Sequence, residues 1–127
     1  MGAALVQQSA ADVPLDAAKK TYQEAADILG YDMAKLCFDG PEEKLNQTEY
    51  TQPALLTTSI AVWRALETSC DIGLAVAGHS LGEYSALVAA GAMSFSDAVL
   101  LVSQRGRFMQ EAVAFGEGGM AAVVGLS

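Results

Sequence analysis

The sequence predicts an α/β fold, in which buried strands alternate with helices. Helical spacing of apolar residues runs through the first half, whereas two short apolar stretches without that spacing, 72–78 and 120–126, occur in the second half. The resulting order of helix, strand, helix and strand is typical of α/β proteins. With 127 residues, 52% hydrophobic and 17% charged, the chain is long enough to bury a core and is not of disordered composition.

The first half is expected to be helical throughout. Apolar residues recur at helical spacing over 15–29, which predicts an amphipathic helix. Shorter helical segments are expected over 32–38 and 41–46, each bounded by Gly or Pro. A long helix is expected to begin at Gln52 and Pro53, with Pro53 in the first turn. Backbone N–H groups in the first turn have no acceptor within the helix, so a proline there costs no backbone hydrogen bond.

The second half predicts strands as well as helices. The run 72–78 is continuously apolar, as in a strand buried on both faces. Small residues over 84–90 predict a helix, and a capping-box pattern beginning at Ser94 predicts another over 95–114. A second strand is expected over 120–126.

Charge and composition exclude several classes of function. Seven basic against fifteen acidic residues give a net charge of −8, so the chain lacks the basic surface that nucleic acids and anionic membranes require. No segment approaches the ~18 apolar residues of a spanning helix, and the first residues lack the basic flank of a signal peptide. Cys37 and Cys70 favour free thiols over a disulfide or a metal site. A cytoplasmic protein without metal, membrane or nucleic-acid partners is predicted.

The pentapeptide at 78–82 reads GHSLG and matches the G-x-S-x-G pattern of a nucleophile elbow, with a strand expected before it and a helix after it. Such a turn strains the backbone of Ser80 and exposes its hydroxyl, while Gly78 and Gly82 let strand and helix approach. The N–H of Leu81 points to where an oxyanion would develop. Ser80 is therefore the candidate nucleophile, and an ordinary glycine-rich turn is the alternative.

A serine nucleophile needs a base, and the sequence contains one histidine, His79, next to Ser80. Neighbouring side chains on such a turn diverge. His79 is therefore expected to pack or hydrogen-bond behind the turn rather than to accept the Ser80 proton, and the sequence supplies no other base.

Arg105 stands on the apolar stripe of the helix expected over 95–114, four residues after Leu101 and four before Met109. A guanidinium in apolar surroundings must find an anion, because an unpaired buried charge is costly. Two interpretations stay open: an internal salt bridge to a carboxylate on another helix, or a bidentate clamp for a substrate carboxylate. Beside a serine nucleophile, the clamp predicts an acyl group that carries a second, free carboxylate.

Three segments, in family order and spacing, resemble the malonyl-CoA:acyl carrier protein transacylases. Residues 78–87 (GHSLGEYSAL) resemble the serine elbow, 104–110 (QRGRFMQ) the arginine helix, and 50–55 (YTQPAL) an upstream T-Q-P-A motif. The similarity covers nearly the whole chain. It implies an incomplete, helix-rich, α/β-hydrolase-like acyltransferase subdomain over 1–118, followed at 119–127 by the first strand of a truncated ferredoxin-like subdomain.

The resemblance implies that malonyl is transferred from malonyl-CoA to the phosphopantetheine thiol of acyl carrier protein through a seryl ester, in fatty acid biosynthesis. It implies that Ser80 forms the ester, the Leu81 N–H is an oxyanion donor, and Arg105 pairs with the malonyl carboxylate. Gln52 would line the entrance to the site, and capping the helix at Pro53 is a compatible alternative. No bound cofactor or metal is implied. Structural roles beside the site are implied for Gly78, His79 and Gly82.

Two features of that family are not matched: a G-Q-G-x-Q motif on a first strand, and a catalytic histidine in the second half of the protein. The chain therefore resembles roughly the first two-fifths of a transacylase, and by itself it is expected to transfer little or no malonyl. Two other classes stay open. A serine hydrolase or thioesterase would share the elbow but have no use for Arg105, and a non-catalytic fragment or partner module would use neither.

Overall fold

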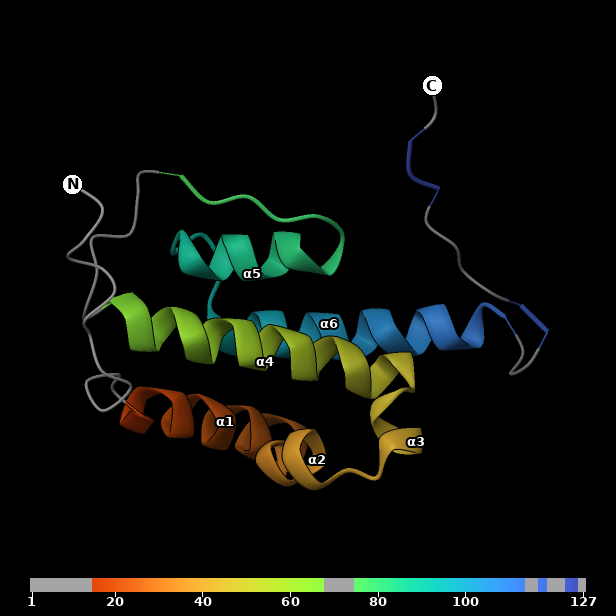
Figure 1. The fold of residues 1–127 in the computed structure, drawn as a ribbon, viewed down its shortest axis with the longest axis horizontal. Helices are drawn as coiled ribbons and strands as arrows, with labels where there is room; N and C mark the ends of the chain where they lie inside the picture. The colour runs from red at the N-terminus through yellow and green to blue at the C-terminus, as the bar shows by residue number, and fades with distance from the viewer. Residues whose placement is uncertain (1–14, 68–74, 114–116, 119–122, 126–127) are drawn as a thin grey trace.

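The computed structural model describes residues 15–67, 75–113, 117–118 and 123–125 (Figure 1). These residues form a layered packing of helices, in which α4 contacts α1, α5 and α6. No helix in these parts of the chain is long and apolar enough to cross a membrane. The helices are α1 (Leu15–Leu29), α2 (Met33–Asp39), α3 (Glu42–Leu45), α4 (Thr48–Glu67), α5 (Leu81–Ala89) and α6 (Phe95–Glu111).

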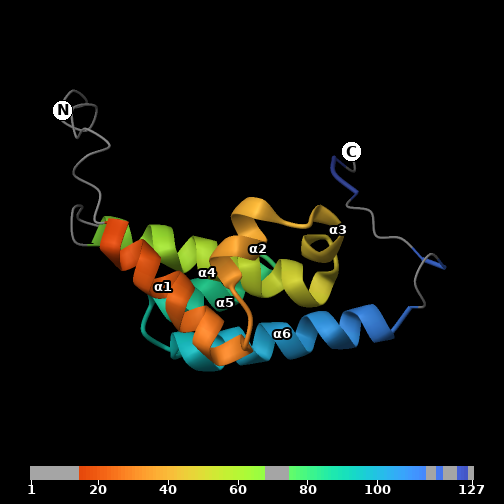
Figure 2. The same cartoon turned by 90° about the horizontal axis from the view of Figure 1, so that it is seen from below.

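The first three helices confirm the sequence-based prediction. α1 spans 15–29 and ends before Gly30, whose φ of +75° is a conformation that favours glycine. α2 begins after Asp32, whose carboxylate accepts the N–H of Lys35 at 2.8 Å as an N-cap. Seen from below, α1 lies across α4 and α6 (Figure 2).

α4 begins earlier than the sequence predicted. It starts at Thr48, so Pro53 lies inside the helix and Gln52 is not its N-cap; the capping alternative for Gln52 is wrong. The N–H groups of Tyr50 and Thr51 both donate to the Gln47 carbonyl at 2.9 Å, which forms a helical turn before the proline. Pro53 removes one backbone bond but does not prevent this earlier turn from forming.

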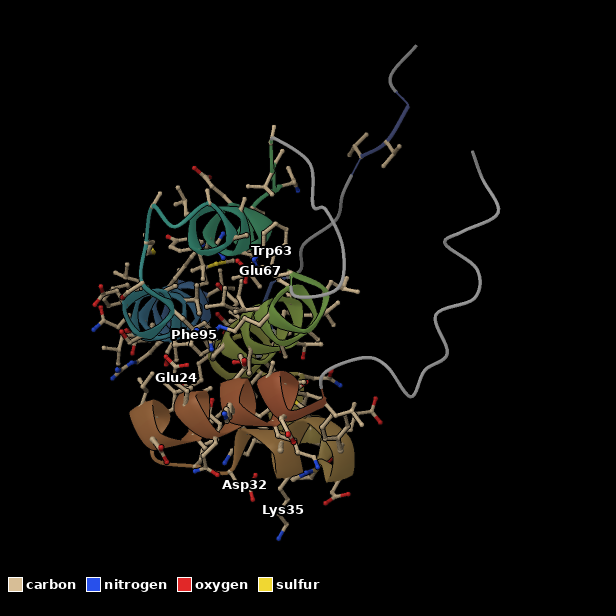
Figure 3. All side chains as sticks on the ribbon, turned by 90° about the vertical axis from the view of Figure 1, so that its left-hand side faces the viewer. Glu24, Asp32, Lys35, Trp63, Glu67 and Phe95 are labelled. Carbon is tan, nitrogen blue, oxygen red and sulfur yellow. The ribbon has the colours of Figure 1, made fainter. Side chains whose placement is uncertain are left out.

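The core lies where α4, α6 and α1 meet. Leu56 and Ile60 of α4 pack there with Val99 and Val102 of α6, and all four are essentially inaccessible to solvent. At one end of this core Arg64 of α4 forms an ion pair with Glu24 of α1 at 2.7 Å. The Arg64 guanidinium also lies 4.8 Å from the centre of the Phe95 ring, so one cation ties α1, α4 and α6 together. Its two partners, Glu24 of α1 and Phe95 of α6, are labelled in Figure 3.

The two predicted strands lie partly outside the described residues, which do not include 72–74, 120–122 or 126. The described remainders, 75–78 and 123–125, have no regular secondary structure. A strand is defined by its bonds to a neighbouring strand, and the described parts of the chain contain no strand with which these segments could pair. The predicted division between 1–118 and 119–127 stays a prediction.

Candidate active site

Ser80 occupies the turn that leads into α5. Its φ is +55° and its ψ is −115°, and no other non-glycine residue in the described parts of the chain has a positive φ. This conformation is strained for a residue that carries a Cβ atom. The residue is exposed to solvent. Because an ordinary tight turn would place glycine at such a position, the strain at Ser80 favours the nucleophile elbow over the alternative interpretation.

Gly78 allows the backbone to fold back closely at this turn. A Cβ atom at position 78 would overlap the carbonyl group of Gly82 and lie 2.6 Å from the Glu83 nitrogen. A Cβ atom at position 82 would meet nothing within 4 Å. Position 78 therefore requires glycine for steric reasons, as expected, but position 82 does not. The carbonyl group of Gly82 faces Gly78, whereas a side chain at position 82 would point into open space.

The N-terminus of α5 offers one unused donor next to Ser80. The N–H groups of Gly82 and Glu83 donate to the carbonyls of His79 and Ser80 at 2.9 and 3.2 Å. The N–H of Leu81 has no acceptor among the described residues. It lies at the positive end of the helix dipole, where it can donate a hydrogen bond to an oxygen that develops negative charge.

The His79 side chain is exposed and makes no hydrogen bond to Ser80 or to any other described residue. The expectation that it packs behind the turn therefore does not hold in the described structure, where no element covers that side of the turn. Within the turn His79 contributes only its backbone carbonyl, which accepts from Gly82.

Arg105 reaches from α6 to two of the other predicted site residues. One guanidinium nitrogen, Nη2, donates to Ser80 Oγ at 3.1 Å, and the other, Nη1, donates to Gln52 Oε1 at 2.5 Å. The guanidinium carbon lies 6.0 Å from the centre of the Tyr84 ring on α5. The structure thus brings together three residues from α4, the elbow and α6 that the sequence singled out separately.

The Arg105 charge has no anionic partner in the described structure. No carboxylate of these residues lies within ion-pairing distance of it, and the ion pair that they do form joins Arg64 to Glu24. The internal salt bridge considered from the sequence is therefore not found there. Arg105 is half-buried and bonded to neutral acceptors, which leaves its positive charge available to an anionic ligand.

The apolar stripe around Arg105 is more exposed than the sequence predicted. Ala98 and Val102 face the core, but Leu101 is 43% and Met109 36% exposed. With their neighbours on α6 these last two residues line a shallow hollow of about 390 Å³ beside Arg105. The reason is that α4, α1 and α5 pack against other parts of α6, and the described residues leave this part of its surface open.

Gln52 is 5% exposed and makes three hydrogen bonds. Besides accepting from Arg105, its side-chain nitrogen donates to Thr48 Oγ1 at 2.9 Å and to Met109 Sδ at 3.3 Å. Sequence reasoning missed Thr48 and Met109. Thr48 stands one helical turn before Gln52, a spacing that would have indicated the contact had the start of α4 been placed correctly.

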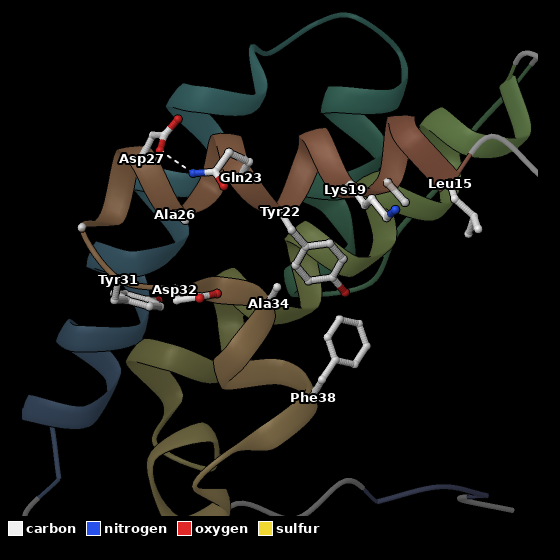
Figure 4. A pocket seen from close by; sticks show the side chains of 12 residues that line it. Leu15, Lys19, Tyr22, Gln23, Ala26, Asp27, Tyr31, Asp32, Ala34 and Phe38 are labelled. Atoms are coloured by element: carbon white, nitrogen blue, oxygen red, sulfur yellow. Dashed lines mark hydrogen bonds between the residues drawn. The ribbon is translucent and has the colours of Figure 1, made fainter.

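A second hollow, of about 660 Å³, lies between α1 and α2 and contains none of the predicted site residues (Figure 4). Nearby, burial raises the pKa of the Cys37 thiol and of the Tyr31 hydroxyl, so both stay protonated at neutral pH and neither is an activated nucleophile. In the described part of the chain no three His, Cys, Asp or Glu side chains form a group that could hold a metal ion.

The sequence matches known proteins over almost all of its length. The model of the acyl transferase domain family matches residues 1–126. The malonyl CoA-acyl carrier protein transacylase of Salmonella typhimurium is 51% identical over 123 residues, which are 96% of this chain and 39% of that protein. The transacylase of Bacillus subtilis strain 168 is 54% identical over 110 residues, 87% of this chain and 35% of that protein.

Solved structures of acyltransferases also match this chain. An acyl carrier protein S-malonyltransferase from Vibrio cholerae matches with a TM-score of 0.77 and 50% identity, over 84% of this chain and 36% of that one. A malonyl-transacylase in complex with a type II PKS acyl-carrier protein matches with a TM-score of 0.75 and 50% identity. The match covers 82% of this chain and 35% of that transacylase. These neighbours confirm the predicted α/β fold class. The chain spans about two-fifths of the length of its curated relatives, and it belongs to the acyl transferase domain family.

Proposed function

We propose that the protein to which this chain contributes transfers a malonyl group from malonyl-CoA to the phosphopantetheine thiol of acyl carrier protein. The observation that carries this proposal is the Arg105 guanidinium, which lies 3.1 Å from Ser80 Oγ and has no carboxylate partner among the described residues. A nucleophile and a free cation at hydrogen-bond distance suit an acyl donor with its own carboxylate.

The separation of these two groups also limits the length of the acyl group. The guanidinium is within hydrogen-bond distance of the attacking oxygen, so the substrate carboxylate must lie close to the reacting carbonyl. In malonyl a single methylene separates the two. A longer dicarboxylic acyl group would carry its carboxylate past Arg105, and an acetyl group would leave the guanidinium unpaired.

In the proposed reaction Ser80 Oγ attacks the thioester carbonyl of malonyl-CoA, and its proton passes to a base outside the described residues. The Leu81 N–H donates to the oxyanion. The carbon–sulfur bond breaks, CoA leaves as the thiol after taking up the proton, and malonyl remains on Ser80 as an ester. The thiol of acyl carrier protein then gives its proton to the same base and attacks the ester carbonyl. The new carbon–sulfur bond forms the malonyl thioester, the ester carbon–oxygen bond breaks, and the proton returns to Ser80 Oγ.

The same proposal places the activity in fatty acid biosynthesis in the cytoplasm, without a bound cofactor or metal. The name of the Salmonella typhimurium relative, which gives malonyl CoA and acyl carrier protein, supports the part of this proposal that concerns donor and acceptor. A serine hydrolase or thioesterase is less well supported, because it would not need Arg105 beside its nucleophile. A non-catalytic module is less well supported because it would have no use for the strained backbone of Ser80.

The test is a chimera in which this chain replaces the segment of the Salmonella typhimurium transacylase to which it aligns over 123 residues. The chimera should transfer malonyl from malonyl-CoA to holo-acyl carrier protein and accumulate a malonyl ester on Ser80, detected by intact mass. Ser80→Ala should abolish both. Hydrolysis of malonyl-CoA without transfer, or equal use of acetyl-CoA and malonyl-CoA, would contradict the proposal.

A further inference from the structure

We propose that Thr48 is a positioning residue, which acts through Gln52 to hold the Arg105 guanidinium beside Ser80 and thereby sets the preference for carboxylate-bearing acyl groups. The inference rests on the proposed function, because it concerns how that site selects its acyl donor. The Thr48 side chain makes no hydrogen bond to Ser80 or Arg105. Its Oγ1 accepts a hydrogen bond from Gln52 Nε2 at 2.9 Å, one turn further along α4.

The chemistry of the three side chains permits one orientation of the Gln52 amide. A guanidinium has only donors, so the carbonyl end of the amide must face Arg105. The NH₂ end then needs acceptors, which are Thr48 Oγ1 and the Sδ of Met109. A hydroxyl oxygen accepts more strongly than a thioether, and Gln52 is too buried for water to substitute readily. Thr48 is therefore the principal partner of that end.

Without a fixed Gln52, Arg105 has another place to go. Its side chain is long and flexible, and the hollow of about 390 Å³ that it lines together with Leu101, Phe108 and Met109 does not include Ser80. A guanidinium that swings into that hollow no longer meets an acyl group held at Ser80. The bond from Arg105 to Gln52 confines it to the nucleophile side, which reduces the entropy lost when the substrate carboxylate binds.

The backbone around Thr48 is held firmly enough to position a side chain. α4 and α6 lie side by side there (Figure 1), and a Cβ atom at Gly106 would lie 2.5 Å from the Thr48 carbonyl oxygen and 2.6 Å from Glu49 Cα. The residue that follows Arg105 thus packs directly against the residue that orients Gln52. Hydrogen bonds link the side chains of Thr48, Gln52 and Arg105 in series. The backbones at the two ends of this series, at Thr48 and Arg105, lie where α4 and α6 cross.

The test compares Thr48→Val, which removes the acceptor and keeps the shape, with Thr48→Ser, which keeps the hydroxyl, in the transacylase chimera. For Thr48→Val the ratio of malonyl-CoA to acetyl-CoA kcat/KM should fall about tenfold, the usual effect of losing one buried hydrogen bond to a positioned group. The fall should lie mainly in the KM for malonyl-CoA, because the carboxylate is paired in both the ground state and the transition state. Thr48→Ser, which keeps the hydroxyl, should have the same ratio as the parent chimera.

Thr58→Val is the matched control, because Thr58 is an exposed threonine on the same helix whose hydroxyl bonds to Ala54 and Tyr22. It should leave the ratio unchanged. An unchanged ratio in Thr48→Val, or an equal loss with both substrates, would overturn the positioning role. If the Thr48→Val variant does not fold, Thr48→Ala, which adds no bulk, replaces it. The ratio of malonyl-CoA to acetyl-CoA kcat/KM must then fall about tenfold in Thr48→Ala. Absence of malonyl transfer by the parent chimera would instead overturn the proposed function, and this inference with it.

Discussion

Arg105 donates a hydrogen bond to Ser80 Oγ at 3.1 Å, although the two residues stand 25 positions apart in the chain. The serine is held on a strained turn and the arginine on a straight helix, so each is placed by a different element. The neutral hydroxyl of Ser80 and the amide oxygen of Gln52 are the acceptors for the guanidinium. A substrate carboxylate would provide a stronger, charged acceptor at the same place.

Replacing Arg105 by alanine should remove the preference for malonyl. The kcat/KM of the chimera for malonyl-CoA should fall on the order of 100-fold, because a charge-assisted pair with the substrate carboxylate is lost. Transfer of acetyl, which has no carboxylate, should persist. Steady-state kinetics with both thioesters measure this, and Arg107→Ala, an exposed arginine on the same helix, is the control. Equal losses with both substrates would show that Arg105 does not recognise the carboxylate.

Replacing Gln52 by glutamate should also weaken the use of malonyl-CoA, for a different reason. The new carboxylate would lie where Oε1 now accepts from Arg105 and would pair with the guanidinium internally. The KM for malonyl-CoA should rise roughly tenfold, with a smaller change for acetyl-CoA. Gln47→Glu adds the same charge at an exposed position nearby and should have little effect. A parent-like KM in Gln52→Glu would show that Arg105 is not available to the substrate.

Replacing Gly106 by alanine should destabilise the protein. The added Cβ atom would lie 2.5 Å from the Thr48 carbonyl oxygen, so α6 and α4 must move apart. The free energy of unfolding should fall by about 1–3 kcal/mol. Gly82→Ala is the matched control: its Cβ atom meets nothing within 4 Å, and the change should be neutral or stabilise by about 0.4–1 kcal/mol. Urea denaturation of both variants checks the difference, and equal stabilities would refute the close helix crossing.

Replacing Ser80 by glycine should abolish acyl transfer and leave the protein more stable than replacing Ser80 by alanine does. Ser80→Ala also removes the hydroxyl but keeps a Cβ atom at a φ of +55°. Glycine adopts this conformation without strain, at the cost of a more flexible unfolded chain. The net expectation is that the glycine variant is more stable than the alanine variant by about 1 kcal/mol. If the alanine variant proves as stable, the turn is not strained at this residue.

Local patterns predicted most of the helices. The spans of α1 and α2 follow from apolar spacing and from Gly30 and Asp32 at their ends, because a helix boundary is set by capping groups close in sequence. The start of α4 was not predicted, because proline is favoured in the first turn of a helix and disfavoured further in, whereas Pro53 lies in the second turn. In the structure the first residues of α4, Thr48 and Glu49, lie against Gly106, a residue far along the chain, and local spacing does not reveal such a contact.

By itself the sequence indicated the candidate site residues: a serine in an elbow pattern, an arginine on the apolar stripe of a helix and a glutamine in a T-Q-P-A motif. These are local properties of spacing and residue type. Only the tertiary structure decided that Ser80, Arg105 and Gln52 meet, that no described carboxylate neutralises the arginine, and that Thr48 and Met109 complete the hydrogen bonding of Gln52. The physical reason is that the partner of a charge depends on the distance between helices, and that distance is set by how α4 and α6 pack at Gly106.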